Sequence, residues 1–179
     1  MAQIRSKPFG VTKEGANVTE YILSNPGGLT VSVLDYGCVI KSIIVPAKNG
    51  PVDVVVGHDT MADYEADFNS SGSTCCGAFV GRYANRIGGS KFTLYEEEYH
   101  VTPNEGKNCL HSGLHGFNHT LFDVALTPGE TDSVTMTAHS PAGTDGFPGN
   151  FDLEIQYSLV KEGLMIRYSA TTDAPTVCN

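Results

Sequence analysis

The sequence has few basic residues. It contains 11 Lys plus Arg against 20 Asp plus Glu, which gives a formal net charge of -9 at pH 7. A nucleic-acid backbone and an anionic membrane surface both attract a basic face, so this balance argues against either as a partner. The acidity itself is explained by solubility, because a net charge far from zero keeps molecules apart.

Long apolar runs are also missing. No segment of the 179 residues approaches the length that is needed to cross a bilayer. Residues 1–10 lack the apolar centre of a secretory signal peptide. We therefore expect a cytoplasmic protein, with room for one sizeable core in a single domain.

The cysteines form no recognisable framework. There are five, an odd number, and no Cys-x-x-Cys spacing occurs, although Cys75 and Cys76 are adjacent. This number and spacing of cysteines indicate neither a disulfide scaffold nor a zinc knuckle. We expect buried free thiols.

Helical signals are scarce, and strand signals are frequent. Only residues 61–68, preceded by the capping pair Asp59 and Thr60, predict a helix. The predicted strands are 29–33, 39–45, 52–56, 133–138, 151–160 and 164–170. The 20 glycines and 9 prolines fit many tight turns between them. The fold class expected is all-β, an antiparallel β-sandwich.

Three of these strands carry more specific predictions. Alternation over 29–33 indicates one solvated face, and the apolar run 52–56 is compatible with burial on both faces. In 151–160 every second residue from Phe151 is apolar, which places these side chains on one face. The connection 161–163, with glycine last, suits a three-residue hairpin turn that is closed by a left-handed residue.

The residues best suited to chemistry are Asn85, Arg86 and His111. The amide both donates and accepts hydrogen bonds, the guanidinium presents a rigid fork of donors, and imidazole moves a proton near neutral pH. Sugar hydroxyls are donors and acceptors at once, so this mixture suits a neutral polyol. Arg82, within the same segment, is the better candidate for a structural arginine.

A metal site is the main alternative for the histidines. His111, His115 and His119 are spaced four residues apart, which on a helix would align three imidazoles. Gly113 and Gly116 oppose such a helix, so we expect no metal there. Cys109 has no recognisable base partner and is a weak candidate nucleophile. Residues 145–150 predict a surface turn and lack the ligand pattern of a calcium loop.

Several motifs together resemble the galactose mutarotase (aldose 1-epimerase) family. They are residues 57–59, the Gly-Arg-Tyr-Ala-Asn-Arg-Ile segment at 81–87, Asn-Cys-Leu-His-Ser-Gly and its continuation at 108–117, Asp-Gly-Phe-Pro-Gly at 145–149, and 172–176. The resemblance implies a β-sandwich enzyme that interconverts the α and β anomers of aldohexoses such as galactose and glucose, without a cofactor. It also implies that Asn85 and Arg86 bind sugar hydroxyls and that His111 acts beside the reacting oxygens.

The sequence departs from this family in two ways. Ser112 stands where the family usually has glycine, and members are nearly twice as long as this chain. By resemblance, the histidine acid lies shortly past the equivalent of Asn179 and the glutamate base lies further on. We therefore expect residues 1–179 to be the N-terminal portion of one epimerase domain that carries the sugar-binding half of the site. The partner would be the missing C-terminal half or a second copy of the chain.

Ring opening needs an acid at the ring oxygen and a base at the C1 hydroxyl together. Two main hypotheses follow: an epimerase whose chain has been cut or is completed by a second fragment, or a non-catalytic carbohydrate-binding or structural module derived from that fold. A third, less favoured, is a metal-dependent hydrolase built on the three spaced histidines.

Overall fold

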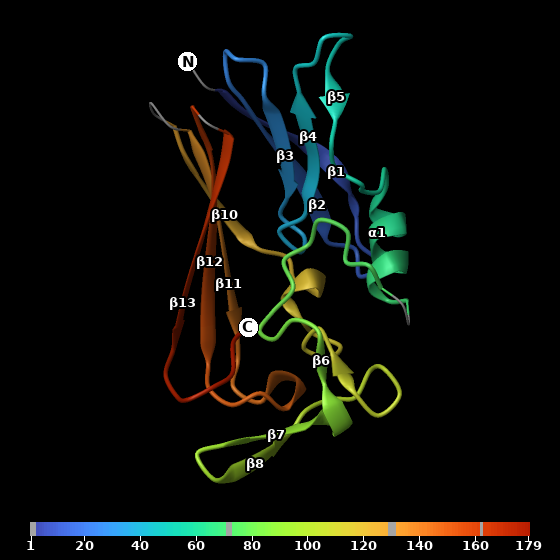
Figure 1. Cartoon of the computed structure of the whole chain (residues 1–179), viewed down its shortest axis with the longest axis vertical. Coiled ribbons are helices and arrows are strands. Elements are labelled where there is room, and N and C mark those ends of the chain that lie inside the picture. Colours follow the sequence, from blue (N-terminus) through green and yellow to red (C-terminus); the bar gives the residue numbers. More distant parts are fainter. Residues whose placement is uncertain (1–2, 71–72, 129–131, 162) are drawn as a thin grey trace.

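The computed structural model describes residues 3–70, 73–128, 132–161 and 163–179. It contains two antiparallel sheets that face each other (Figure 1). The first has the strand order β1 (Gln3–Val11), β2 (Asn17–Ser24), β3 (Thr30–Leu34), β4 (Ile40–Val45) and β5 (Val52–Asp53). The second has the order β10 (Asp123–Thr127), β11 (Ser133–Ser140), β12 (Phe151–Val160) and β13 (Gly163–Thr172). The predicted antiparallel β-sandwich is thus confirmed.

Smaller elements lie at one end of the sandwich. Two short antiparallel pairs are β6 (Arg86–Ile87) with β9 (Cys109–Leu110), and β7 (Lys91–Leu94) with β8 (Glu97–His100). The described residues also include three 3-10 turns, Gly88–Ser90, Phe117–His119 and Thr144–Gly146. In Figure 1 the β7–β8 hairpin lies at the bottom of the molecule, and β6 lies below the first sheet, beside the lower end of the second.

The only α-helix among the described residues is α1 (Met61–Phe68), with the bounds predicted from the sequence. Thr60 is its N-cap, and the Thr60 hydroxyl accepts a hydrogen bond from the Asp63 amide at 3.2 Å. Its buried residues Met61, Tyr64 and Phe68 pack with Val18 and Leu34 of the first sheet. Among the described residues, no helix has the length and apolar character needed to span a bilayer.

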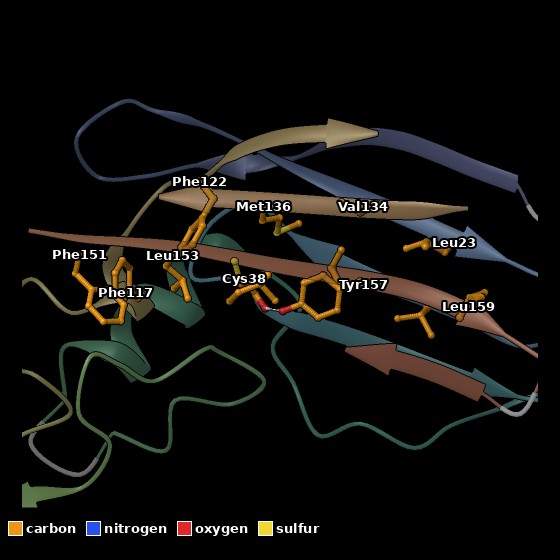
Figure 2. Packing of buried hydrophobic residues seen from close by; sticks show 13 residues of the cluster. Leu23, Cys38, Phe117, Phe122, Val134, Met136, Phe151, Leu153, Tyr157 and Leu159 are labelled. Carbon is orange, nitrogen blue, oxygen red and sulfur yellow. Dashed lines mark hydrogen bonds between the residues drawn. The ribbon is translucent and has the colours of Figure 1, made fainter. Parts of the chain in front are cut away.

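The main core lies between the two sheets. The predicted inward residues of β12 are all buried, and they meet Leu23, Val31 and Val33 from the first sheet. The Tyr157 hydroxyl crosses the interface and donates a hydrogen bond to the Cys38 carbonyl at 2.7 Å (Figure 2). The core therefore includes one polar link between the sheets.

Three details of the predicted strands are wrong. β5 covers only Val52–Asp53, and Val54 and Val56 are 59% and 83% exposed, because this segment runs along the open edge of the first sheet. β3 is buried on both faces after Thr30, because on the face expected to be solvated the Ser32 hydroxyl pairs with that of Ser42 at 2.9 Å and Leu34 packs with α1. Gly163 pairs with Val160 inside the sheet and has a φ of 149°, outside the left-handed helical region, while Glu162 lies outside the described residues.

All five cysteines are free. Cys38, Cys75 and Cys109 are buried, Cys76 is half-buried, and Cys178 is exposed. The expectation of buried thiols therefore holds for three of them and not for Cys178.

Candidate functional site

Pairing of β6 with β9 brings the two polar segments together. Arg86 lies opposite Leu110 in this ladder, so Asn85 and His111 are neighbours just beyond its end. The His111 amide donates to the Asn85 carbonyl at 3.0 Å, and the Asn85 amide donates to Nδ1 of His111, also at 3.0 Å. The three predicted site residues therefore share one local network.

The backbone at this place is unusual. Asn85, His111 and Ser112 have φ angles of 64°, 52° and 72°, in the left-handed region that favours glycine. The Ser112 hydroxyl accepts from the Tyr83 amide at 2.7 Å and lies 3.1 Å from the Tyr83 carbonyl, to which it donates. Ser112 thus keeps a conformation suited to glycine, and its buried hydroxyl is hydrogen-bonded to the backbone of Tyr83 in the 81–87 segment.

Glu105 is a site residue that the sequence did not reveal. Its two carboxylate oxygens accept hydrogen bonds from Nε and Nη2 of Arg86, each at 2.6 Å. Nη1 of Arg86 donates to the Asn85 side-chain oxygen at 2.9 Å. Glu105 lies 19 positions after Arg86, in a turn tied to Asn108, and no motif marks it. The ion pair lowers the pKa of Glu105 and raises the pKa of Arg86.

His111 is held as a neutral imidazole. Burial lowers its pKa, and the nearby Arg86 charge lowers it further, while Glu105 opposes this shift. Because Nδ1 accepts the Asn85 amide, the neutral ring carries its proton on Nε2. This tautomer makes Nε2 a hydrogen-bond donor. His111 also lines a small pocket of about 30 Å³ with Asn104 and Asn118.

Arg82 has the structural role that was expected of it. It is 3% exposed, and its guanidinium donates to the carbonyls of Ser140, Pro141, Pro148 and Gly149 at 2.7 to 3.1 Å. It also lies over the Phe151 ring at 5.3 Å. Arg82 therefore joins the site segment to the second sheet.

The segment 145–150 is more buried than its sequence predicts. Phe147 is 1% exposed, and the Asp145 carboxylate accepts the His115 amide at 2.7 Å. Gly113, with a φ of 93°, packs so closely on Asp145 that a Cβ there would lie 2.7 Å from its carboxyl carbon. The interpretation as a surface turn is wrong, because this segment packs under the site.

The three spaced histidines occupy different surroundings. His115 lies 3.3 Å from Asp145 with a side chain 74% exposed, whereas His119 packs edge-on against Phe68. His111 is tied to Asn85. The expectation that they bind no metal stays a prediction, with this separation in its favour.

Comparison with known proteins identifies the family. Residues 19–179 match the family described as aldose 1-epimerase. The chain belongs to this family. It is 31% identical to a galactose mutarotase of Bos taurus over 180 residues, covering all of this chain and 50% of that protein. It is 32% identical to a maltose epimerase of Levilactobacillus brevis, covering 97% of this chain and 50% of the other.

A solved structure has the same fold as this member of the epimerase family. The galactose 1-epimerase of Lactobacillus acidophilus superposes with a TM-score of 0.85 at 23% identity, covering 99% of this chain and 51% of the other. The fold is therefore the antiparallel sandwich of this isomerase family. The chain spans about half the length of the curated relatives it matches.

Proposed function

We propose that residues 1–179 form the N-terminal portion of one aldose 1-epimerase domain and supply its sugar-binding wall. Asn85, Arg86 and His111 would contact an aldohexose, and a second polypeptide segment would supply the principal acid and base. The observation that carries this proposal is the pair of hydrogen bonds by which Asn85 joins the other two residues: its backbone amide donates to the His111 imidazole, and its side-chain oxygen accepts from Arg86.

The network suits a neutral sugar because it presents donors. Within the described part of the chain, three of the five N–H groups of Arg86 donate to Glu105 and Asn85, which leaves two for a ligand. The Asn85 side-chain oxygen is occupied by Arg86, so its NH₂ group faces a ligand as a donor. Nε2 of His111 adds another donor. Sugar hydroxyl and ring oxygens accept such bonds, and the geometry would orient the substrate for proton transfer.

The same network is poorly equipped for the complete reaction. Mutarotation needs one group to protonate the ring oxygen while another takes the C1 hydroxyl proton. Neutral His111 is a weak acid, and the lowered pKa of Glu105 makes this paired carboxylate a weak base. This arrangement also favours a second candidate function, a carbohydrate-binding module without catalysis.

The open side of the second sheet fits a completing segment. β13 is the edge strand, and Tyr168 is 57% exposed on it. Beside it, a mostly apolar pocket of about 490 Å³ is lined by Phe79, Val80, Phe151 and Tyr168, together with Ala84 next to the site. An unpaired edge beside apolar side chains is a surface on which further strands pack. The occupant we propose is the half of the domain that the relatives contain beyond the matched region, and a second copy is the alternative.

Binding is tested by titrating the isotope-labelled chain with galactose, glucose and maltose and following the NMR signals of Asn85 and His111. We expect saturable shifts at both residues with at least one sugar. Arg86→Ala should remove most of the binding, whereas the control Arg167→Ala, on β13, should retain it. Absence of saturable shifts at these residues would contradict the assigned site.

Activity is tested by polarimetry of freshly dissolved α-galactose. The chain alone should produce little acceleration, because a positioned acid–base group contributes typically 10²–10⁴-fold and both principal groups are missing. Adding the C-terminal half of the Bos taurus relative should raise the rate, and His111→Asn should then abolish most of the gain. No gain despite sugar binding would favour the carbohydrate-binding module. A full enzymatic rate from the chain alone would show that acid and base both lie within it.

The cytoplasmic location and the role in hexose metabolism also stay predictions.

A further inference from the structure

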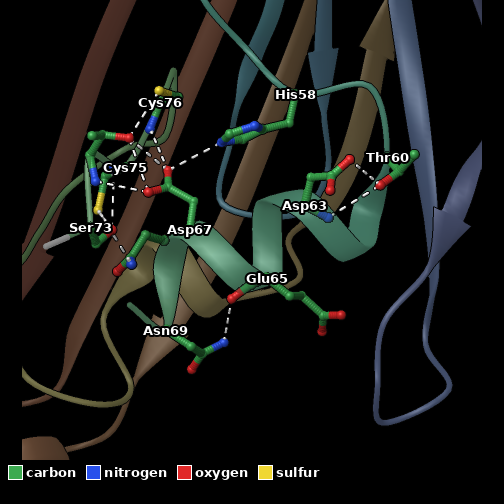
Figure 3. Close-up of polar contacts among 11 residues, drawn as sticks. His58, Thr60, Asp63, Glu65, Asp67, Asn69, Ser73, Cys75 and Cys76 are labelled. Atoms are coloured by element: carbon green, nitrogen blue, oxygen red, sulfur yellow. Dashed lines mark hydrogen bonds and ion pairs between the residues drawn. The ribbon is translucent and has the colours of Figure 1, made fainter. Parts of the chain in front are cut away.

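A second group of chemically active side chains lies away from the sugar site. His58 precedes α1, Asp67 is in its last turn, and Cys76 follows in the segment that returns to the sheet (Figure 3). One ligand atom from each of the three lies within 4.8 Å of the other two. Nε2 of His58 and Oδ2 of Asp67 are already 3.5 Å apart.

The His58 imidazole has no complete set of partners. Its Nε2 atom is buried and makes no well-formed hydrogen bond, and Oδ2 of Asp67 stands only at ion-pair distance from it, although the side chain as a whole is 30% exposed. A buried polar atom without a partner costs free energy, so such atoms in folded proteins normally have a ligand, an ion or a water. The Nε2 atom lies on the side of the ring that faces the Asp67 carboxylate.

The neighbouring groups hold the carboxylate in place. Asp67 accepts hydrogen bonds from the Thr74 amide at 2.9 Å, from the Thr74 hydroxyl at 2.9 and 3.0 Å, and from the Cys76 amide at 3.3 Å. The Thr74 hydroxyl also lies 3.1 Å from the Cys76 sulfur. Ordinary loop stabilisation explains Asp67 and Thr74. It does not explain why the His58 imidazole and the Cys76 thiol both lie beside the same carboxylate.

We propose that His58, Asp67 and Cys76 bind one Zn²⁺ ion, with a water molecule as the fourth ligand. Imidazole, carboxylate and thiolate together are ligands of Zn²⁺, whereas Mg²⁺ and Ca²⁺ require oxygen ligands. Zinc bonds of 2.0 to 2.3 Å place neighbouring ligand atoms roughly 3.5 Å apart. The His58–Asp67 pair meets this distance, and because all three ligand atoms lie within 4.8 Å of one another, the other pairs must close by at most about 1.3 Å. Binding releases the Cys76 thiol proton to solvent.

A metal ion here would connect three parts of the chain. It would fix the entrance and the last turn of α1 to the segment that contains Cys76. That segment continues through Gly77, whose carbonyl accepts the Ile40 amide at 2.9 Å, toward Gly81 and Arg82. The bound ion would therefore stabilise the start of the segment that carries Asn85 and Arg86.

The test uses Co²⁺ as a spectroscopic probe and Zn²⁺ as its competitor. The reduced 179-residue chain should bind one Co²⁺ with a thiolate-to-cobalt charge-transfer band and the visible bands of tetrahedral coordination, and Zn²⁺ should displace it. Cys76→Ser should abolish the charge-transfer band. His58→Ala should weaken Zn²⁺ binding by more than about a hundredfold, because loss of a direct ligand exceeds the 10–100-fold effect of an outer partner.

The matched control is Cys178→Ser, which removes the exposed thiol and should leave the band and the affinity unchanged. Circular dichroism of each variant establishes that it is folded. Absence of a charge-transfer band in the wild-type chain, or its persistence in folded Cys76→Ser, would overturn the proposal. Loss of the band in Cys178→Ser alone would assign the metal to Cys178 and would overturn it equally.

Discussion

Arg82 and Arg86 show how neighbouring residues of one type acquire different roles. Arg82 is buried and donates to backbone carbonyls at the end of β11 and in the connection from β11 to β12, whereas the Arg86 side chain is 52% exposed and pairs with Glu105. The difference arises because Arg86 lies on the short strand β6, which directs it to the outside beside Asn85. Each guanidinium is held by several hydrogen bonds, but only that of Arg86 is largely exposed.

At the residue scale, we predict that the free energy of unfolding decreases as the pH falls below about 6.5, the usual histidine pKa. Burial lowers the pKa of both His111 and His119 in the folded chain. The unfolded chain therefore takes up protons at a pH where the folded chain does not, so acid favours unfolding. Urea unfolding at pH 7.5 and pH 5.5 measures this loss.

The variant His119→Gln should reduce the pH dependence of that free energy. His100→Gln is the control, because the His100 side chain is 72% exposed. If His119→Gln and wild type lose the same free energy between the two pH values, burial of this imidazole is not the cause.

At the element scale, the β7–β8 hairpin has an unfavourable turn. Tyr95 and Glu96 connect the strands, and both have positive φ angles, 50° and 69°. Two such residues form the geometry of a type I′ turn, which normally requires Asn-Gly or a similar pair. The sequence carries no such signal, so the hairpin could not be predicted from it.

We predict that the double replacement Tyr95→Asn with Glu96→Gly stabilises the chain by about 1 kcal/mol. The gain arises because a left-handed conformation costs an ordinary residue roughly 1–2 kcal/mol and costs glycine little. Urea unfolding measures the gain, and amide hydrogen exchange of residues 91–100 localises it. Glu96→Ala, which removes the same carboxylate without relieving the backbone, should show no comparable stabilisation. Equal stabilisation by both would show that charge, and not turn conformation, is responsible.

At the scale of the whole molecule, the two sheets share an apolar core with a polar link from Tyr157 to Cys38. The Tyr157 ring is 2% exposed, and burial raises its hydroxyl pKa far above the usual range. The hydroxyl therefore stays protonated and donates to the Cys38 carbonyl at 2.7 Å. This bond joins residues 119 positions apart in the sequence.

We predict that Tyr157→Phe destabilises the chain by about 1–3 kcal/mol, because the Cys38 carbonyl is left buried without its partner. Urea unfolding provides the measurement. Tyr168→Phe is the matched control, since Tyr168 is 57% exposed and its change should be near zero. Equal effects of the two replacements would indicate that the inter-sheet bond contributes nothing specific.

Much of the sandwich could be predicted because its signals are local. The cap at Thr60 defines the start of α1, and period-two alternation defines β12, since both depend on residues a few positions apart. The short strands β6 and β9 lack such a signal. Each covers two residues, and they form only because distant segments pair.

The sequence by itself determined the all-β class, the helix bounds, the inward face of β12 and, through its motifs, the candidate residues Asn85, Arg86 and His111. Only the tertiary structure decided that Glu105 holds Arg86, that His111 keeps its proton on Nε2, and that His58, Asp67 and Cys76 lie together. It also decided that Val56 is exposed and that 145–150 is packed. The physical reason is the separation along the sequence of the residues that interact. Helix caps and strand alternation depend on residues a few positions apart. Ion pairs, desolvation and ligand clusters depend on which distant segments the fold brings within a few ångströms of one another.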